Sequence, residues 1–513
     1  MNEWSEGYNA DISYTYGYFP EFNPLRAQWL LLNAGIAPPA WPATGGAACE
    51  LGFGQGVSVA VHAAGSNVQW WGTDFMPEQA AYAMDMVRAS GTEAHLYDQA
   101  FSEFCKRDDL PQFDSIGMHG IWSWVSEENR NTIVDFLRRK LKPGGVLYVS
   151  YNTQPGWSSG MPLRHLLTSH AAAMGTRGQG VIARIDEAVK FANRLMDVNP
   201  GYLRANPAVR DRLERLATLD KTYLAHEYFN REWEPMHFAQ MVERLAPAKL
   251  SYACSALMLD NIDGLNLPAD QLKFVNDIPR GTFRETVRDF CVNQQFRRDY
   301  WIKGARQLNP IEQHEAILAQ RVVMVVPAAA ISLKVNGASG EISLRPDIYK
   351  PLVALLADHV PRTVEEVLAG VSGGPVGFAA VREAITVMIG MGVVQLCQSD
   401  AAASSAKPRT DRLNAFLCDQ ARTGGISYLA SPLVGGHAVN RRQQLFMLAR
   451  NSGLRTPGEW AQYAWSQLSQ MGQRLTKHGV TLMSAQENLT ELELQAQDFM
   501  SARLPILKAL KIA

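Results

Sequence analysis

The residues best suited to chemistry in this chain form a glycine-rich turn between a predicted strand and a predicted helix. The strand leads to Glu50, and glycines follow at alternate positions as Gly52, Gly54 and Gly56. Glycine lets the backbone adopt positive φ and approach a bulky ligand closely, and the helix predicted from Val57 has free N–H groups at its start. A turn of this kind in a doubly wound α/β sheet holds a nucleotide-like cofactor, although Gly-x-Gly-x-Gly alone is weak evidence for one.

An acidic residue after the next predicted strand strengthens this interpretation. The apolar run Val68–Thr73 leads to Asp74, and an acid roughly 20 residues past the glycines can accept hydrogen bonds from a ribose diol. A dinucleotide fold prefers Gly-x-Gly-x-x-Gly, whereas Val57 occupies the place of the last glycine here, and no phosphate-binding Lys-Ser/Thr pair follows. The pattern therefore indicates a cofactor without a pyrophosphate, and S-adenosylmethionine fits that description.

Three further predicted strands continue the alternation of strands and helices. They span Glu93–Asp98, Phe113–His119 and Val146–Tyr151, and the helix Asn129–Leu141 lies between the last two. Such alternation predicts a parallel sheet that binds ligands at the carboxyl ends of its strands, where Asp98 could meet an adenine edge. The predicted cofactor-binding residues lie at or just beyond such ends, and they are Glu50, Gly52, Phe53, Gly54, Gly56, Asp74, Phe75, Met76, Asp98, Gln99, His119, Gly120 and Ile121.

These motifs together resemble the class I S-adenosylmethionine-dependent methyltransferases. The resemblance rests on Glu50–Gly56, Asp74, Asp98 and the Leu-Lys-Pro-Gly-Gly segment Leu141–Gly145, in this order along the chain. It implies an α/β fold with a doubly wound, Rossmann-like sheet, and it implies S-adenosylmethionine as the cofactor at the glycine turn.

Four further segments resemble a narrower bacterial group of methyltransferases. They are His119–Val125, Tyr151–Trp157, Tyr223–Tyr228 and Leu429–Gly436. That group carries a methyltransferase regulatory domain and includes outer-membrane-protein lysine methyltransferases. The resemblance extends over most of the chain, and it implies the fold and the cofactor while leaving the methyl acceptor open.

A methyltransferase needs little catalytic machinery beyond a pocket for its acceptor. Transfer from a sulfonium is an in-line displacement with an activated leaving group, so the enzyme chiefly positions the acceptor and excludes water. A lysine amine, with a pKa of about 10.4 in water, needs apolar surroundings that disfavour its ammonium form, and aromatic faces hold a methylated cation. We therefore expect an aromatic acceptor pocket formed by Tyr14, Tyr16, Tyr18, Trp124 and Trp157.

The candidate catalytic residues follow the predicted fourth and fifth strands. They are His119, Trp122, Tyr151 and Asn152. His119 is either a base or, as we favour, a residue that lines the cofactor pocket. For each tryptophan, packing in the core is the alternative to a place in the acceptor pocket.

Composition and charge exclude several other classes of protein. The 513-residue chain is 47% hydrophobic and 19% charged with a net charge of −1, which gives no attraction for nucleic acid or anionic membranes. Its first residues lack the features of a signal peptide, and no apolar run approaches the ~18 residues of a membrane span. The six cysteines have neither paired nor metal-type spacing. We therefore expect a cytoplasmic protein with reduced thiols, no metal, no nucleic-acid partner and no membrane insertion.

The length of the chain predicts about three to four domains. We expect an aromatic N-terminal arm or lid over residues 1–45, a class I methyltransferase domain over 46–262 with a helical insertion at about 160–225, a helical regulatory-type segment over 263–320, a winged-helix-like domain over 321–400 and a C-terminal helical domain over 410–513. Within these ranges, residues 283–301 are predicted as a solvated helix face and 400–410 as a linker. Residues 331–400 contain seven acidic and five basic residues, which favours protein over DNA as a partner.

The leading hypothesis is an S-adenosylmethionine-dependent methyltransferase whose acceptor is a protein lysine side chain. The same chemistry on a glycan or small metabolite is one alternative, and a non-catalytic module for cofactor binding or protein docking is another. Intact Glu50, Asp74 and Asp98 argue against lost cofactor binding. The C-terminal domain could serve substrate recognition or assembly into homo-oligomers.

Overall fold

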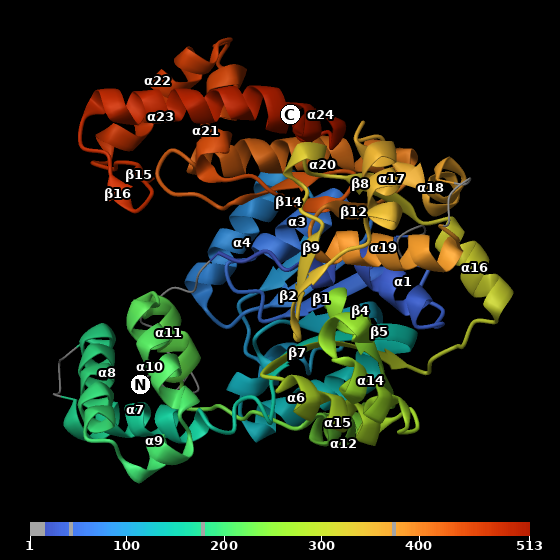
Figure 1. Ribbon diagram of the computed structural model, residues 1–513, viewed down its shortest axis with the longest axis vertical. Helices are drawn as coiled ribbons and strands as arrows, with labels where there is room; N and C mark the ends of the chain where they lie inside the picture. The colour runs from blue at the N-terminus through green and yellow to red at the C-terminus, as the bar shows by residue number, and fades with distance from the viewer. Residues whose placement is uncertain (1–15, 41–44, 176–179, 372–375) are drawn as a thin grey trace.

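The computed structural model describes residues 16–40, 45–175, 180–371 and 376–513. Its centre is a seven-stranded sheet with the strand order β3-β2-β1-β4-β5-β7-β6 (Figure 1). Strands β1 to β5 are parallel, as predicted, while β7 runs antiparallel between β5 and β6. The strands are β1 (Ala47–Leu51), β2 (Gln69–Thr73), β3 (Ala94–Tyr97), β4 (Phe113–Met118), β5 (Leu141–Asn152), β6 (Leu250–Ser255) and β7 (Phe296–Lys303).

Helices cover both faces of this sheet. They include α1 (Pro24–Asn33), α3 (Val57–Gly65), α4 (Pro77–Ser90), α5 (Phe101–Phe104), α6 (Glu127–Lys140) and α12 (Phe238–Leu245). On one face, Trp70, Tyr148 and Tyr300 share a hydrophobic core with residues of α1, α3 and α4. On the other face, Leu147 and Trp301 share a core with residues of α5, α6 and α12. Successive side chains of a strand point to opposite faces, so neighbours such as Leu147 and Tyr148 enter different cores.

Helix α6 has strong signals at both of its ends. The Ser126 hydroxyl accepts a hydrogen bond from the Asn129 N–H at 3.2 Å, and this cap replaces a bond that the first turn lacks. Acidic residues in the first turn and basic residues in the last suit the helix dipole, while Ile133 and Leu137 recur at helical spacing and are buried. The helix therefore begins at a defined residue and holds the loop before it at the carboxyl edge of the sheet.

Five helices inserted after β5 form a lobe of their own, drawn in green in Figure 1. They are α7 (Met161–Met174), α8 (Val181–Asp197), α9 (Gly201–Ala205), α10 (Ala208–Thr218) and α11 (Lys221–Tyr228). Buried side chains such as Leu163, Ile185 and Leu213 form a core that is separate from the two cores of the sheet. The lobe occupies the range expected for a helical insertion.

Strand β7 corrects the prediction of a solvated helix over residues 283–301. Helix α15 (Thr282–Val292) ends at Asn293, whose φ is +49°, and the chain then enters the sheet. Arg297 and Asp299 are only 4% and 1% exposed. The sequence analysis assigned these charged side chains to a solvent-exposed helix face, whereas in the fold Arg297 and Asp299 are buried and form an ion pair.

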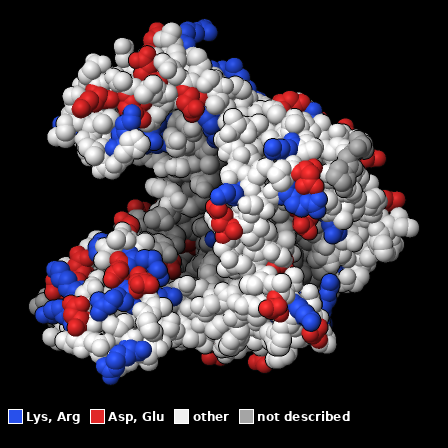
Figure 2. Space-filling view, viewed as in Figure 1, with Lys and Arg blue, Asp and Glu red and all other residues white. Residues whose placement is uncertain are grey.

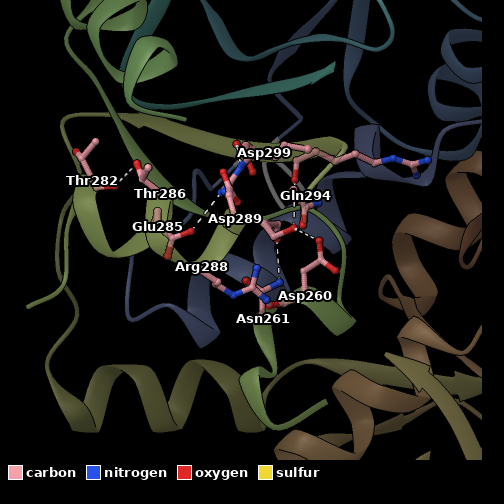
Figure 3. A network of polar contacts seen from close by, with 12 residues as sticks. Asp260, Asn261, Thr282, Glu285, Thr286, Arg288, Asp289, Gln294 and Asp299 are labelled. Carbon is pink, nitrogen blue, oxygen red and sulfur yellow. Dashed lines mark hydrogen bonds and ion pairs between the residues drawn. The ribbon is translucent and has the colours of Figure 1, made fainter. Parts of the chain in front are cut away.

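The buried Arg297 guanidinium binds three carboxylates, which belong to Glu285, Asp289 and Asp299 and are labelled in Figure 3. Its Nη1 donates to Asp289 Oδ1 at 2.6 Å, its Nε to Asp299 Oδ2 at 2.9 Å and its Nη2 to Glu285 Oε2 at 3.2 Å. Asp299 also accepts a hydrogen bond from the Tyr151 hydroxyl at 2.8 Å. Because removing one member leaves an uncompensated buried charge, this network fastens α15 and β7 to β5.

Residues 263–397 add short helices and a second, smaller sheet. The three-stranded sheet is antiparallel with the order β11-β8-β12, and β9 and β10 form a separate hairpin. The winged-helix assignment stays a prediction. The elements are α13 (Asp263–Asn266), α14 (Ala269–Asn276), α16 (Pro310–Leu318), β8 (Arg321–Met324), β9 (Lys334–Gly337), β10 (Gly340–Ser343), α17 (Pro346–Leu356), β11 (Arg362–Thr363), α18 (Val364–Gly370), α19 (Phe378–Gly390) and β12 (Val394–Cys397).

The predicted linker over residues 400–410 is wrong, because these residues begin the 21-residue helix α20 (Asp400–Gln420). Its Arg409 donates to the Ser66 carbonyl at 2.7 Å, and its Arg412 donates to the Ser90 carbonyl at 2.8 Å. Both carbonyls lie at the ends of α3 and α4, on which α20 packs. The Ala- and Ser-rich composition suggested a linker, but small residues also let a helix pack closely against its neighbours.

The chain ends in four helices and two short hairpins, so this region is not wholly helical as predicted. The Thr456 hydroxyl accepts from the Glu459 N–H while Glu459 accepts from the Thr456 N–H, and Ser484 and Glu487 repeat the arrangement. Both arrangements are capping boxes, which define the start of the helix that follows each of them. The elements are β13 (Tyr428–Ser431), β14 (Gly435–Ala438), α21 (Arg441–Asn451), α22 (Pro457–Gln470), β15 (Thr476–Lys477), β16 (Val480–Thr481), α23 (Ala485–Asp498) and α24 (Leu504–Ala509).

Helix α20 should behave as part of the core and not as a linker. The side chain of Leu413 is fully buried, so Leu413→Ala should lower the free energy of unfolding by about 2–5 kcal/mol. Asp411→Ala, on the exposed side of the same helix, should change it by no more than about 0.5 kcal/mol. Urea unfolding measures the free energy of unfolding of the two variants. Equally small changes in both would support the predicted linker instead of a packed helix.

Candidate active site

A cavity lies at the carboxyl ends of β1, β2 and β4, and with the open solvent at its mouth it encloses about 1260 Å³ of empty space. The loops after these strands contribute residues 52–55, 74–76 and 119–121 to its lining, and α11 with the residues that follow it contributes others. This is the edge at which a parallel α/β sheet binds its ligands. Figure 2 shows the molecule hollowed between the insertion lobe and the C-terminal helices.

Most of the predicted cofactor-binding residues line this cavity. Of the exceptions, Glu50 and Gly56 belong to the glycine turn without lining the cavity, and Asp98 is exposed. The Thr73 hydroxyl binds the carbonyl of Gln99 at 2.5 Å, and Gln99, not Asp98, reaches the cavity. The predicted residues that do line it are Gly52, Phe53, Gly54, Asp74, Phe75, Met76, Gln99, His119, Gly120 and Ile121.

The three glycines of the turn all have positive φ, of +74°, +56° and +74°. A side chain at Gly52 would collide with Ile121, and one at Gly56 would collide with Ala83. At Gly54, by contrast, the nearest atom to an added Cβ is Gln79 Oε1 at 3.7 Å. Gly52 and Gly56 therefore permit the local packing, whereas Gly54 leaves its space to the cavity.

The Asp74 carboxylate joins two of the loops that line the cavity. Its Oδ2 accepts from the Gly54 N–H at 2.8 Å, and its Oδ1 accepts from the Met76 N–H at 3.0 Å. Burial raises the pKa of Asp74 to about 6. A carboxylate oxygen with one such bond can accept another, so Asp74 can still bind two hydroxyl groups of a ligand.

Two buried polar atoms beside the turn have no hydrogen-bond partner among the described residues. They are Oε2 of Glu50 and Nε2 of Gln79. Burial and the neighbouring Asp74 raise the pKa of Glu50 well above its usual value. Buried polar groups are normally hydrogen-bonded, and of these two residues Gln79 lines the cavity, so its Nε2 fits a site that receives a polar ligand. Together with the open space at Gly54, it fits the adenosine and amino-acid groups of S-adenosylmethionine.

His119 lies against the N-terminal arm at the edge of the cavity. Its ring stacks on Phe19 with centroids 3.6 Å apart, and its Nδ1 lies 2.7 Å from the Tyr148 hydroxyl. Burial lowers the pKa of His119 to about 4, so the imidazole is neutral at pH 7. It lines the cavity, in agreement with the role that the sequence analysis favoured.

The other predicted catalytic residues, Trp122, Tyr151 and Asn152, do not line the cavity. Trp122 is fully buried in the core beneath α6. Tyr151 donates to Asp299, as described above, and Asn152 Oδ1 accepts from Trp157 Nε1 at 3.1 Å. Strand β5 lies between β4 and β7, and the polar groups at its end are taken up by Asp299 and Trp157 and do not reach the cavity. Local sequence could not reveal these partners.

The predicted acceptor pocket is corrected in the same way. Tyr16 is exposed, Tyr18 is buried with its hydroxyl accepting from the Gly436 N–H at 2.9 Å, and Trp157 packs in the core of the insertion. Tyr14 lies outside the described residues. Only Trp124 of that set lines the cavity. The arm contributes Gly17 and Phe19 instead, because alternate residues of an extended segment point to opposite sides.

Several lining residues carried no expectation of their own. Among them is Glu227 on α11, whose pKa burial raises to about 7. Its only sequence signal was its place in Tyr223–Tyr228, a segment that supported the family resemblance without a role for any of its residues. The others are Gln55, Gln79, Ala100, Phe101, Val125, Ser126, Asn129, His226, Asn230 and Glu232.

Metal and membrane signals were searched over the part of the chain that the structure describes. It contains no group of three or more His, Cys, Asp or Glu side chains suited to a metal ion. None of its helices is both long and apolar enough to cross a membrane. The six cysteines are free thiols.

Comparisons with known proteins agree with this geometry. A family model described as a predicted methyltransferase regulatory domain matches residues 220–303. An uncharacterized protein of Synechocystis, sll1526, is 34% identical over 514 residues, covering 99% of this chain and 100% of its own. The solved structure of PKMT2 from Rickettsia typhi in complex with AdoHcy has a TM-score of 0.71 at 18% identity, covering 97% of this chain and 99% of that one.

This chain belongs to the class I S-adenosylmethionine-dependent methyltransferases that carry a methyltransferase regulatory domain, in one family with the Synechocystis protein. The Rossmann-like fold predicted from the sequence is confirmed. Within the fold, the matched region begins at α11, continues through α12 and β6, and ends with β7. The regulatory domain is therefore part of the catalytic sheet.

Affinity for S-adenosylmethionine should rise with pH as Asp74 ionises. An ionised carboxylate binds hydroxyl donors more strongly than its neutral form, and with a pKa of about 6 it is mostly protonated at pH 5. The Kd should fall up to about tenfold between pH 5 and pH 7.5. Asp74→Asn should weaken binding and remove that dependence. Calorimetry measures both effects, and a pH-independent affinity of the native protein would exclude Asp74 as a ligand.

The two tryptophans of the loop after β4 should respond differently to truncation. Trp122→Ala should lower the free energy of unfolding by about 3–5 kcal/mol, with the turnover of the folded fraction unchanged. Trp124→Ala should leave the melting temperature closer to the native value and reduce turnover at least about tenfold, because Trp124 lines the cavity and positioning contributes strongly to rate. If Trp122→Ala instead reduced turnover with little loss of stability, Trp122 would belong to the active site.

Proposed function

We propose that this methyltransferase transfers a methyl group from S-adenosylmethionine to the side-chain amine of protein lysines. The observation that carries the proposal is the pairing of aromatic and acidic side chains in one cavity. Trp124, Glu227 and Glu232 line it together with the cofactor loops. An aromatic face and carboxylates attract a cation, which fits a lysine ammonium better than a neutral glycan hydroxyl.

The residues of the glycine turn would hold the cofactor. Asp74 would accept the ribose hydroxyls, the backbone at Gly54 would allow close approach, and Gln79 would donate to a polar group from beside the turn. The likeness to PKMT2, solved in complex with AdoHcy, supports this assignment. When bound, S-adenosylmethionine supplies a methyl group that its sulfonium activates for in-line attack.

The remaining lining residues would then select and orient the acceptor. Trp124 lies 6.1 Å from Trp233, centroid to centroid, and the Arg164 guanidinium lies 4.7 Å from the Trp233 ring. These contacts hold the Trp124 side chain in place. Burial of the site also lowers the pKa of a bound amine, so that less of it is charged. Such surroundings favour the neutral, nucleophilic form of lysine.

A protein acceptor, and not a small amine, is supported by the shape of the molecule. Figure 2 shows a hollow between the insertion lobe and the C-terminal helices, and we propose that the acceptor protein enters there. We propose the winged-helix-like and C-terminal regions as docking or assembly surfaces. The free cysteines support a reducing, cytoplasmic location.

The purified protein should transfer label from methyl-tritiated S-adenosylmethionine to proteins of a cell extract freed of small molecules. Acid hydrolysis and amino-acid analysis should recover the label in methylated lysine. Gly54→Val should abolish the transfer, since a branched side chain would be strained at φ +56° and would fill cofactor space. Label recovered only in glycans or small metabolites, or in other amino acids, would contradict the lysine assignment.

A further inference from the structure

Helix α11 presents one carboxylate to the cavity from the insertion lobe. Leu224, Ala225 and Tyr228 of this helix are buried in the core of the insertion, and they fix its orientation. Glu227, between these buried residues, lines the cavity. The carboxylate therefore stands on a packed helix, and its position does not depend on a loose loop.

Glu227 has no hydrogen bond or ion pair with any residue that the structure describes. The other carboxylates of the cavity differ in this respect. Both oxygens of Asp74 accept backbone N–H groups, and Glu232 is bound by Arg231 at 2.9 Å with its side chain 38% exposed. Glu227 is thus the carboxylate whose two oxygens are open to a group that enters the cavity.

The surroundings of Glu227 suit a group that takes up and releases a proton. Burial alone raises the pKa of Glu227 to about 7, and catalysis by proton transfer is most effective when the pKa lies near the working pH. The titratable groups that line the cavity with it are His226, Glu232, Asp74 and His119. Tyr228 on its own helix interacts with Glu227 and with Arg212 and Arg215 of α10. Lys221 of the same helix pairs at 2.8 Å with Asp186 of α8, which packs against it. His119 is neutral at pH 7, because burial lowers its pKa to about 4.

We propose that Glu227 is the catalytic base that deprotonates the acceptor ammonium before methyl transfer. This inference rests on the proposed function, because it requires an amine acceptor. Among the described residues that line the cavity, Glu227 is the carboxylate without a bound partner, and it shares that cavity with Trp124, where the acceptor cation is expected. The role would give the regulatory domain, which includes α11, a direct part in the reaction.

The step balances in atoms and charge. One N–H bond of the acceptor ammonium breaks, and its proton forms an O–H bond with the Glu227 carboxylate, leaving a neutral amine. The nitrogen lone pair then forms the N–C bond to the methyl group while the C–S bond breaks, and that electron pair stays on sulfur. The product is a methylated ammonium and a neutral thioether, and Glu227 afterwards releases its proton to water.

The raised pKa of Glu227 reduces the difference in pKa between the acceptor ammonium and its base. A free lysine and a free glutamate differ by about six pKa units, whereas a carboxylate at about 7 leaves roughly half of that difference. Desolvation of the ammonium in the cavity lowers its own pKa further. A transfer that is very unfavourable in water thereby becomes accessible at neutral pH.

The test compares Glu227→Gln with the native enzyme from pH 6.5 to 9.5, using the cell-extract proteins as the acceptor probe. At pH 7 the variant should lose about 100-fold or more in turnover. The deficit should shrink as pH rises, because water then deprotonates more of the acceptor. S-adenosylmethionine affinity should stay within about twofold, because Glu227 is assigned to the acceptor and not to the cofactor.

A second measurement does not depend on activity. The folded-state pKa of Glu227 is raised above that of the unfolded chain, so its stabilising effect is present at low pH and is lost as pH rises through about 7. Without ligands, the native protein should lose more melting temperature between pH 5.5 and pH 8 than Glu227→Gln does. Equal losses would contradict the burial of an ionisable group at this position.

Three further variants separate a base from other roles. Glu232→Gln should raise KM while keeping the native pH profile, because Glu232 is assigned only to attraction of the acceptor. Glu214→Gln, an exposed change on α10, should match the native enzyme in every measurement. Glu227→Asp keeps a carboxylate and should retain the native pH profile at a lower rate, which tests the inference even where Glu227→Gln does not fold.

The outcomes distinguish failure of the Glu227 assignment from failure of the proposed function. Native turnover in Glu227→Gln at pH 7, a deficit that does not change with pH, or a parallel loss of cofactor affinity would overturn the role of Glu227 while the lysine acceptor stands. Absence of label from lysine with the native enzyme would overturn the proposed function, and this inference with it.

Discussion

The burial of Arg297 is the constraint on which the arrangement of this protein depends. A guanidinium inside a sheet is tolerated only when its charge and hydrogen bonds are matched, and here three carboxylates from α15 and β7 supply the match. Because one of them also binds Tyr151 of β5, the regulatory strands cannot separate from the catalytic sheet without exposing that charge. The adjacent Arg298 points to the opposite face, where it binds Glu21 of the N-terminal arm at 2.6 Å.

That arm connects the cavity to the far end of the chain. Tyr18 accepts a hydrogen bond from Gly436 in the C-terminal hairpin, and Asn23 donates to the Val434 carbonyl at 2.9 Å. Between these anchors, Phe19 stacks on His119 and lines the cavity. The sequence analysis offered a lid and a packed arm as alternatives, and the described part of the arm combines features of both: Tyr18 and Asn23 bind the C-terminal hairpin, and Phe19 lines the cavity.

Burial raises the pKa of two carboxylates in the cavity, but the two residues have different partners and suit different roles. It raises the pKa of Asp74 to about 6 and that of Glu227 to about 7, because the charged form loses hydration. Asp74 recovers part of this loss from two backbone N–H groups, which suits a group that works as an anion toward a ligand. Glu227 has no such support among the described residues, which suits a group that exchanges a proton.

The sequence by itself determined the order of strands and helices in the methyltransferase sheet, the glycine turn and the acidic residue at Asp74, because periodicity, turn chemistry and helix signals act over a few residues. It did not determine which of Trp122 and Trp124 faces the cavity, that β7 is a buried strand, that α20 is a packed helix, or that Glu227 reaches the site. Each of these outcomes depends on partners far along the chain: Arg297 needs Asp289 and Asp299 around it, and α20 needs α3 and α4 beneath it. Burial and charge pairing are properties of the assembled fold, so only the tertiary structure could decide them.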